Sequence, residues 1–308
     1  MKYFRLIVIG LLMGAAEVVP GVSGGTIAFI TGIYQRLINA IKQFTPALVL
    51  TLFREGIPKV WQQVDGLFLL FLVAGMGTGI VLFAGGISYM LQHHTIVIWS
   101  LFFGLVLASA FVVANQIEQK NLTTLLAAAA GAVFGVTITQ LIPLELEPGP
   151  LTLFLGGSVA VCAWILPGIS GSFILLILGL YAFVIDAIQV LDIYHLAFLG
   201  AGCAVGIVSF SHVLSRLLAH YQDVTLAVLM GFMLGSLVKL WPWKNTLSYL
   251  LRDDGRKIPL VEEPVTPQQY ELLTGADPQI LLAGAVALGG CLLVLLIDWL
   301  VIEDDESR

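Results

Sequence analysis

The sequence predicts an all-α polytopic membrane protein that is built as an inverted repeat of two halves. Its composition, the length of its apolar segments and an internal repeat lead to this fold class. Hydrophobic residues make up 58% of the 308 residues and charged residues only 11%, whereas soluble domains carry roughly 25% charged residues. The mean hydropathy is +0.98. We therefore expect lipid rather than water to surround most of the chain.

Apolar segments of membrane-spanning length recur along the chain. Each holds about 18–22 residues, the length that crosses a hydrocarbon core of roughly 30 Å as an α-helix. The alternation of polar and apolar residues that marks the strands of a porin is missing, and no segment is a convincing strand candidate. The six expected spans lie at about 66–84, 95–114, 122–142, 196–215, 224–241 and 279–301.

An internal repeat divides the chain. PGVSGGTIAFITGIYQRLINAI at 20–41 matches PGISGSFILLILGLYAFVIDAI at 167–188 without a gap, and 11 of the 22 positions are identical. A second match, at a different offset, pairs GMGTGIVLF from Gly75 with GCAVGIVSF from Gly202. One duplication with a longer connection in the first copy, at about 42–64, explains both offsets. The predicted halves are 1–150 and 151–308.

Each half is expected to begin with a broken helix pair, at 5–41 and at 151–188. Proline removes an amide donor and glycine frees the backbone, so Pro20-Gly21 and Pro167-Gly168 should each end one short arm before the next begins. Each pair is then one interrupted span or a re-entrant hairpin that protein shields from lipid. The expected arms are 5–19 and 24–41 in the first half, and 151–166 and 171–188 in the second.

The distribution of basic residues favours re-entrant pairs. Each half then crosses the membrane three times, an odd number, so the two halves are inverted. Cytoplasmic termini place most Lys and Arg residues inside, and the expected outer loops 85–94, 143–150 and 186–195 contain neither. The outer loop 242–278 carries both signs of charge. The basic residues before the first apolar run resemble a signal peptide, but we expect that run to be retained because the segment after it recurs.

The residues after each break suit an anion. Free N–H groups and the positive end of the helix dipole converge where a helix begins, and small residues leave room for a phosphate or carboxylate. Two such ends at membrane depth are the layout of secondary transporters that bind substrate at a repeat interface. The alternative is that the breaks are structural kinks with hydroxyl caps. The candidate binding residues are Ser23, Gly24, Gly25 and Thr26, with Ser170, Gly171 and Ser172.

Four charged residues within or beside apolar segments are further candidates. Glu17 lies three residues before Pro20, where an ionised carboxylate costs at least about 2.5 kcal/mol and needs a partner, a proton or a watery cavity. We hypothesise that it gates transport or carries a coupling proton. Arg36, Arg216 and Lys239 lie at segment ends, where each can pair with a phosphate or extend to the membrane surface.

At these residues the chain resembles the family long listed as domain of unknown function 368, which contains bacterial polyprenyl-phosphate translocases. GAAEVVPGVSGGTIAFITGIYQRLI from Gly14, ILPGISGSFILLILGLY from Ile165 and LMGFMLGSLVKLWPW from Leu229 carry the resemblance. It implies that the substrate is undecaprenyl phosphate, the carrier lipid of cell-envelope glycan synthesis. The lipid would return from the outer to the inner leaflet of the bacterial cytoplasmic (inner) membrane. Glu17 matches the family's acidic position, and the candidate binding residues match its phosphate-facing positions.

Other functions receive less support from the sequence. A channel or secondary transporter for a small anion would use the same helix ends. A membrane enzyme such as a lipid-phosphate phosphatase needs a nucleophile set, a metal set or a nucleotide fingerprint, and none is recognisable. We therefore expect no catalytic residue, metal or cofactor. No basic patch suggests nucleic acid, the three cysteines are isolated, and an oligomer or a purely structural assembly role stays open.

Overall fold

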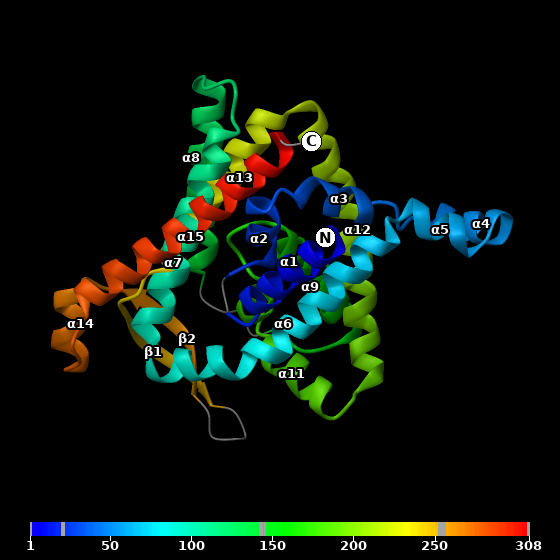
Figure 1. Cartoon of the computed structure of the whole chain (residues 1–308). Helices are drawn as coiled ribbons and strands as arrows, with labels where there is room; N and C mark the ends of the chain where they lie inside the picture. The colour runs from blue at the N-terminus through cyan, green and yellow to red at the C-terminus, as the bar shows by residue number, and fades with distance from the viewer. Residues whose placement is uncertain (1, 20–21, 142–143, 145, 252–256, 307–308) are drawn as a thin grey trace.

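The computed structural model describes residues 2–19, 22–141, 144, 146–251 and 257–306 (Figure 1). Within these ranges the chain is mostly helical, and six helices are long and apolar enough to cross a membrane. All six expected spans are confirmed. They are α6 (Gly66–His93), α7 (Thr95–Asn115), α8 (Leu122–Thr139), α12 (Ile193–His220), α13 (Gln222–Leu240) and α15 (Ile280–Glu306).

Two of the spans are longer than expected. Helices α6 and α12 each have 28 residues, which corresponds to about 42 Å at 1.5 Å per residue. This length exceeds a hydrocarbon core of roughly 30 Å, so each helix must tilt or extend beyond the core. The two helices occupy matching places in the repeat, and each is joined to the next span by a single residue, His94 or Tyr221.

The arms of the broken pairs contain a second break that was not expected. The first pair consists of α1 (Lys2–Glu17), α2 (Gly24–Ile30) and α3 (Tyr34–Ile41), and the second of α9 (Pro150–Ile165), α10 (Gly171–Ile177) and α11 (Tyr181–Gln189). Continuous arms at 24–41 and 171–188 are therefore wrong. Gly32 and Gly179, an identical pair in the repeat, have φ angles of 72° and 74°, a conformation that interrupts a right-handed helix and favours glycine. Helices α10 and α11 are bent by 114°.

The connection at about 42–64 forms two short helices, α4 (Pro46–Glu55) and α5 (Ile57–Gln63). Neither contains a buried residue, and the pair projects away from the other helices (Figure 1). Large apolar side chains on this projection are exposed, including Phe53 and Ile57. Exposed apolar residues of this kind suit contact with lipid at the membrane surface.

The loop 242–278 contains a β-hairpin, which corrects the expectation of no convincing strand. Strands β1 (Lys244–Leu251) and β2 (Lys257–Pro264) pair antiparallel, and α14 (Pro267–Thr274) follows them. Trp241 and Trp243 donate indole hydrogen bonds to the carbonyl oxygens of Val265 and Pro278, both at 2.8 Å. These bonds tie the start of the loop to the residue after β2 and to the end of the loop. The sequence does not predict the hairpin, because its strands are short and mix polar, charged and apolar residues.

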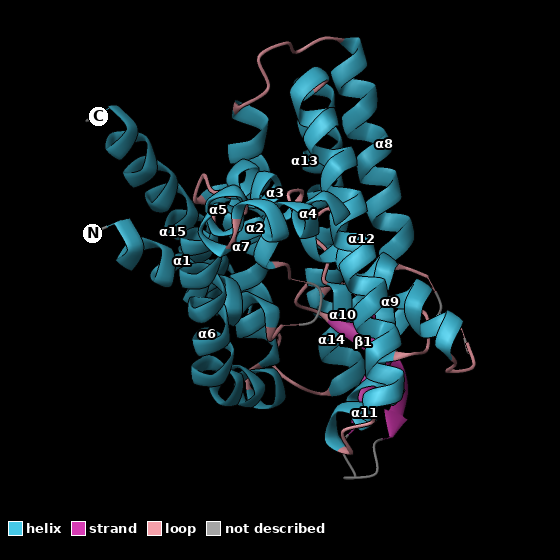
Figure 2. Ribbon diagram, turned by 90° about the vertical axis from the view of Figure 1, so that its right-hand side faces the viewer, coloured by secondary structure: helices cyan, strands magenta, loops and turns pink. Residues whose placement is uncertain are grey.

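The packing of the long helices follows the repeat and also joins its halves. Helix α1 packs on α6 in the first half, and α9 packs on α12 in the second. The last span of each half packs on a span of the other: α8 lies along α13, and α15 lies along α7 (Figures 1 and 2). Each half is therefore completed by the other. The inversion of the halves across the membrane stays a prediction.

The contact between α8 and α13 is close enough to exclude a side chain. A Cβ atom placed on Gly231 in α13 would collide with the backbone of Ala128 in α8. Helices in lipid associate through packing rather than through the hydrophobic effect, and small residues permit this close approach. Gly231 thus helps to hold the two halves together.

We expect the Gly231→Ala variant to lose about 1–3 kcal/mol of stability, because the backbone of Ala128 must move to admit the methyl group. Gly200→Ala in α12 is the matched control, since nothing lies within 4 Å of a Cβ atom there. That control should be neutral or slightly stabilising. Thermal unfolding in detergent measures both variants, and equal Tm values for the two would contradict the packing described here.

Candidate functional site

The two helix breaks meet in the interior of the protein. Ser23, at the start of α2, donates its hydroxyl hydrogen to the carbonyl oxygen of Trp164 near the end of α9, at 2.7 Å. The N–H of Gly168 in the second break donates to Oγ1 of Thr26 in α2, at 3.1 Å. Both hydroxyl residues are almost fully buried. The repeat therefore brings together residues that are about 140 positions apart in the sequence.

Glycines allow the backbones of the two breaks to touch. A Cβ atom on Gly25 would collide with the carbonyl oxygen of Ile165. Gly168 has φ of 97°, which is in the region that favours glycine, and Pro167 beside it is buried. Pro20 and Gly21 of the first break lie outside the described residues.

Glu17 occupies the amide end of α2. Its Oε1 atom accepts a hydrogen bond from the N–H of Gly24 at 2.6 Å, and the side chain of Trp164 lies beside the same carboxylate. The next two N–H groups also have acceptors in the protein. Gly25 donates to Oγ of Ser23 at 3.0 Å, and Thr26 donates to the carbonyl oxygen of Ser23 at 3.0 Å. In this conformation a carboxylate of the chain itself holds the position where an external anion would bind.

The start of α10 differs from that of α2. Ser170 lies at its N-cap, and its hydroxyl shares a hydrogen bond of 2.6 Å with the hydroxyl of Ser172. The N–H groups of Gly171 and Ser172 have no hydrogen-bond partner among the described residues. Both residues are partly exposed, whereas Ser170 is buried. The second break therefore offers unused donors, and the repeat counterpart of Glu17 is the uncharged Trp164.

The three predicted cations have separate surroundings. Arg36 forms a two-point ion pair with Asp65, with Nε–Oδ2 and Nη2–Oδ1 distances of 2.6 and 3.1 Å. Lys239 pairs with Glu262 at 2.9 Å, and its Nζ atom lies 5.0 Å from the ring centre of Phe173 in α10. Arg216 is exposed near the C-terminal end of α12. Lys239 is thus the cation that the structure places beside the second break.

Lys239 belongs to a lysine cluster, Lys239, Lys244 and Glu262, that sequence reasoning missed. The Nζ atom of Lys244 lies 3.6 Å from Oε2 of Glu262 and 3.5 Å from the ring centre of Trp99. Two ammonium groups against one carboxylate leave an excess of positive charge. No local motif marks the cluster, because α13, β1 and β2 each supply one member.

Burial governs the protonation of this cluster. It lowers the pKa of the Lys244 ammonium group to about 7, an effect that Glu262 only partly offsets. Burial alone would raise the pKa of Glu262, but Lys244 and Lys239 outweigh it and hold that pKa below its usual range. The positive charge of the cluster therefore depends on pH near neutrality.

The geometry of the breaks suits binding rather than bond-making chemistry. Hydroxyl and amide donors converge there, and among the described residues the ionisable side chain that contacts them is Glu17. Among the described residues, no group of three or more His, Cys, Asp or Glu residues could hold a metal ion. Amide and hydroxyl donors next to a cation are the groups that bind phosphate and carboxylate anions.

The family model "VCA0040-like: Undecaprenyl phosphate translocase-like" matches residues 13–258, most of the chain. The chain belongs to this family. A relative from Vibrio cholerae serotype O1, named "Polyprenyl-phosphate transporter", is 48% identical to this chain over 96% of each protein. One of the same name from Staphylococcus aureus is 30% identical over 79% of this chain and 88% of its own. No solved structure matches the chain.

The family and the six apolar helices make the chain a multi-pass membrane protein. The family model is described as translocase-like, and both relatives are named transporters. These names agree with the expectation that the chain is not an enzyme.

We expect the stability of the protein to depend on the protonation of Lys244. Between its folded pKa of about 7 and its ordinary value of 10.5, the unfolded chain binds more protons at this residue. The free energy of unfolding should therefore rise with pH in this window, by at most about 1.4 kcal/mol per pH unit, and the penalty of charging Lys244 is fully present below pH 7.

Melting curves of the wild type and Lys244→Met between pH 6.5 and 10 measure this contribution, because Glu262, whose pKa Lys244 also lowers, is a carboxyl group that ordinarily titrates below this range. The wild type should gain stability relative to the variant as pH rises. Lys59→Met, which removes an exposed lysine of α5, should run parallel to the wild type. A constant difference between the wild type and Lys244→Met across the range would contradict the assignment.

Proposed function

We propose that the chain is a flippase that returns undecaprenyl phosphate from the outer to the inner leaflet of the bacterial cytoplasmic membrane, where cell-envelope glycan synthesis reuses it. The observation that carries the proposal is the direct contact between the two breaks, through Ser23 with Trp164 and Thr26 with Gly168. The family description and the names of both relatives support the polyprenyl phosphate as substrate.

The second break supplies the first contacts to the phosphate in this proposal. The unused N–H groups of Gly171 and Ser172, with the hydroxyls of Ser170 and Ser172, can donate to phosphate oxygens. Lys239 of α13 lies over the ring of Phe173 in α10 and adds positive charge. The polyprenyl tail stays in lipid while the headgroup moves, so the site must open sideways to the bilayer during transport.

Glu17 competes with the substrate for the end of α2. A phosphate and an ionised carboxylate cannot share the Gly24 amide, because both are anions in a medium of low dielectric constant. Entry of the phosphate at α2 therefore requires Glu17 to leave or to take up a proton. Inward movement of the anion opposes an inside-negative potential by about 2.3 kcal/mol per charge per 100 mV. A proton carried on Glu17 offsets this cost.

The orientation that fits this direction has both termini in the cytoplasm. The two halves are then inverted, and the broken pairs re-enter from opposite faces to meet at membrane depth. The reciprocal packing of α8 on α13 and of α15 on α7 supports this arrangement. The β-hairpin and α14 then lie outside, and the lysine cluster joins the hairpin to the end of α13.

A leaflet assay with purified protein in vesicles tests the proposed substrate. We expect transbilayer movement of undecaprenyl phosphate but not of phosphatidylglycerol, an anionic lipid whose phosphate is a diester. The double variant Ser170→Ala/Ser172→Ala should slow it by about tenfold or more, because hydrogen bonds to a charged group are lost. Ser88→Ala, at an exposed serine of α6, is the control. Equal movement of both lipids would refute the assignment, and uptake of inorganic phosphate alone would favour a small-anion transporter.

The role of Glu17 has its own test. Glu17→Gln keeps an oxygen acceptor for the Gly24 amide but removes the charge and the exchangeable proton. We expect the pH dependence of transport to flatten, and transport driven by an imposed proton gradient to be lost. Glu118→Gln, at an exposed position, should behave as the wild type. Unchanged rates and an unchanged pH profile in Glu17→Gln would remove proton coupling from the mechanism.

A further inference from the structure

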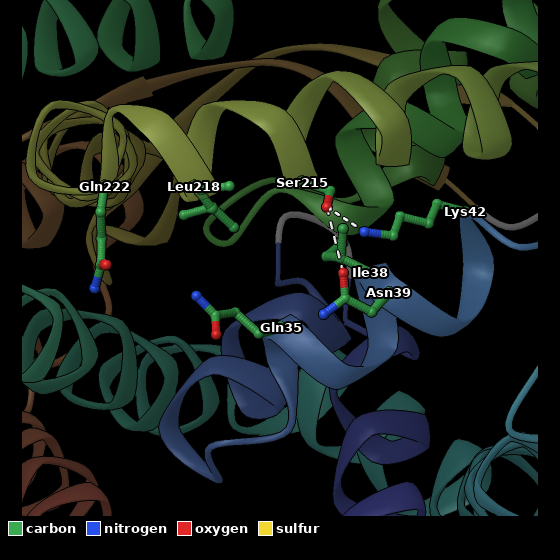
Figure 3. A pocket seen from close by; sticks show the side chains of 8 residues that line it. Gln35, Ile38, Asn39, Lys42, Ser215, Leu218 and Gln222 are labelled. Atoms are coloured by element: carbon green, nitrogen blue, oxygen red, sulfur yellow. Dashed lines mark hydrogen bonds between the residues drawn. The ribbon is translucent and has the colours of Figure 1, made fainter.

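A polar cavity of about 340 Å³ lies between α3 and the C-terminal part of α12, with Gln222 at the start of α13 (Figure 3). Its volume falls in the lower part of the range of about 300–1,000 Å³ that is usual for small-ligand sites. Figure 3 shows the side chains of Gln35 and Gln222 extending toward the same space, with Lys42, Asn39 and Ser215 grouped nearby. The remaining lining residues are Ile38, Leu218 and Ala219.

The cavity has the charge of an anion site. Lys42 is the one charged residue among the eight that line it, and none of them is acidic. Its Nζ atom donates to Oγ of Ser215 at 2.8 Å, and Ser215 donates to Oδ1 of Asn39 at 3.3 Å. No carboxylate of the described residues forms an ion pair with Lys42. An ammonium group that is held only by a hydroxyl keeps donors for an anion.

In a neighbouring cavity the basic residue is already paired with a carboxylate. It shares Gln35 and Asn39 with the first, has a volume of about 510 Å³, and contains Arg36. There the guanidinium group is already neutralised by Asp65, at 2.6 Å. Lys42, directly after the end of α3, therefore keeps donors for an anion, whereas the Arg36 that the sequence suggested does not.

The positive charge of Lys42 has no counterpart in the second copy of the repeat. At the corresponding positions of α11, Gln189 replaces Lys42 and Asp186 replaces Asn39. The same frame thus carries a cation in the first copy and a carboxylate in the second.

We propose that this cavity is a second anion site, which holds the phosphomonoester headgroup after it leaves the helix breaks. The inference rests on the proposed function and extends it to the release side. Helix α2 starts at the first break and leads through the turn at Gly32 into α3, so the chain runs directly from one site to the other. The phosphate replaces Ser215 as the acceptor for Lys42, and the amides of Gln35, Asn39 and Gln222 donate to its other oxygens.

The site is built to release its ligand. The C-terminal ends of α3 and α12 lie at this cavity, and their partial negative charge opposes an anion. Lys42 offsets this opposition without a second cation in the lining. A weak site at an open polar cavity lets the headgroup pass to the aqueous side, whereas a tight one would retain it.

Protection of Lys42 from acylation, measured by mass spectrometry on the purified full chain, tests the site directly. Farnesyl phosphate, a soluble phosphomonoester with a short prenyl tail, should slow modification of Lys42 by about fivefold or more at saturation. Modification of the exposed Lys59 should not change. Inorganic phosphate is the second probe. Protection by inorganic phosphate but not by farnesyl phosphate would overturn the headgroup assignment, and protection by neither would overturn the site.

Transport variants separate this inference from the proposed function. Lys42→Gln should slow movement of undecaprenyl phosphate about tenfold while leaving the preference over phosphatidylglycerol intact, and Lys42→Arg should restore most of the rate because it keeps the charge. Lys59→Gln is the matched control. If the wild type moves the lipid and Lys42→Gln moves it equally fast, the cavity has no role and the flippase assignment stands. If the wild type moves no lipid phosphate, the flippase assignment fails, and the protection experiment alone decides whether the cavity binds anions.

Discussion

The hydrogen bonds between the two helix breaks are the constraint on which the rest of the structure depends. A chain that interrupts its helices at membrane depth frees backbone polar groups that lipid cannot satisfy. Here the hydroxyl groups of Ser23 and Thr26 in the first half bind backbone groups of Trp164 and Gly168 in the second half, and Glu17 and Ser23 bind the first amides of α2. The long helices must then surround this pair and keep lipid away from it. The crossed packing of α8 on α13 and of α15 on α7 meets that need.

The features that the sequence predicted are those written in local composition. Hydropathy placed all six spans, because roughly 20 consecutive apolar residues have few other uses, and the Pro-Gly pairs marked the breaks. The turns at Gly32 and Gly179 were missed, since one glycine in an apolar run is compatible with a continuous helix. The hairpin was missed because strands of mixed polarity give a weak signal. The pairing of Arg36 with Asp65 and the lysine cluster depend on contacts between distant segments, which no local pattern contains.

For the candidate site, the internal repeat was the most informative signal in the sequence, followed by the positions at which its two copies differ. It paired the two breaks, and the structure places them in contact. The positions at which the copies differ then distinguish their roles: Glu17 against Trp164, and Lys42 against Gln189. The two copies of the repeat therefore have matching helices but different charged residues. A transporter needs such a difference if uptake and release of the same anion are to occur under different conditions.

The exchange of final helices between the halves also bears on how the protein is made. Helix α7 emerges from the ribosome long before α15, the helix that packs along it. Gly104 on α7 packs against the backbone of Ala287 on α15. Its packing face therefore has no partner helix in the bilayer until more than 160 further residues have been synthesised. Domains commonly fold one after another from the N-terminus, but here the first half has no complete tertiary structure of its own. The contact of α8 with α13 can form once α13 is inserted, but the contact of α7 with α15 must follow the synthesis of the last helix, so the fold is completed only at the end of synthesis.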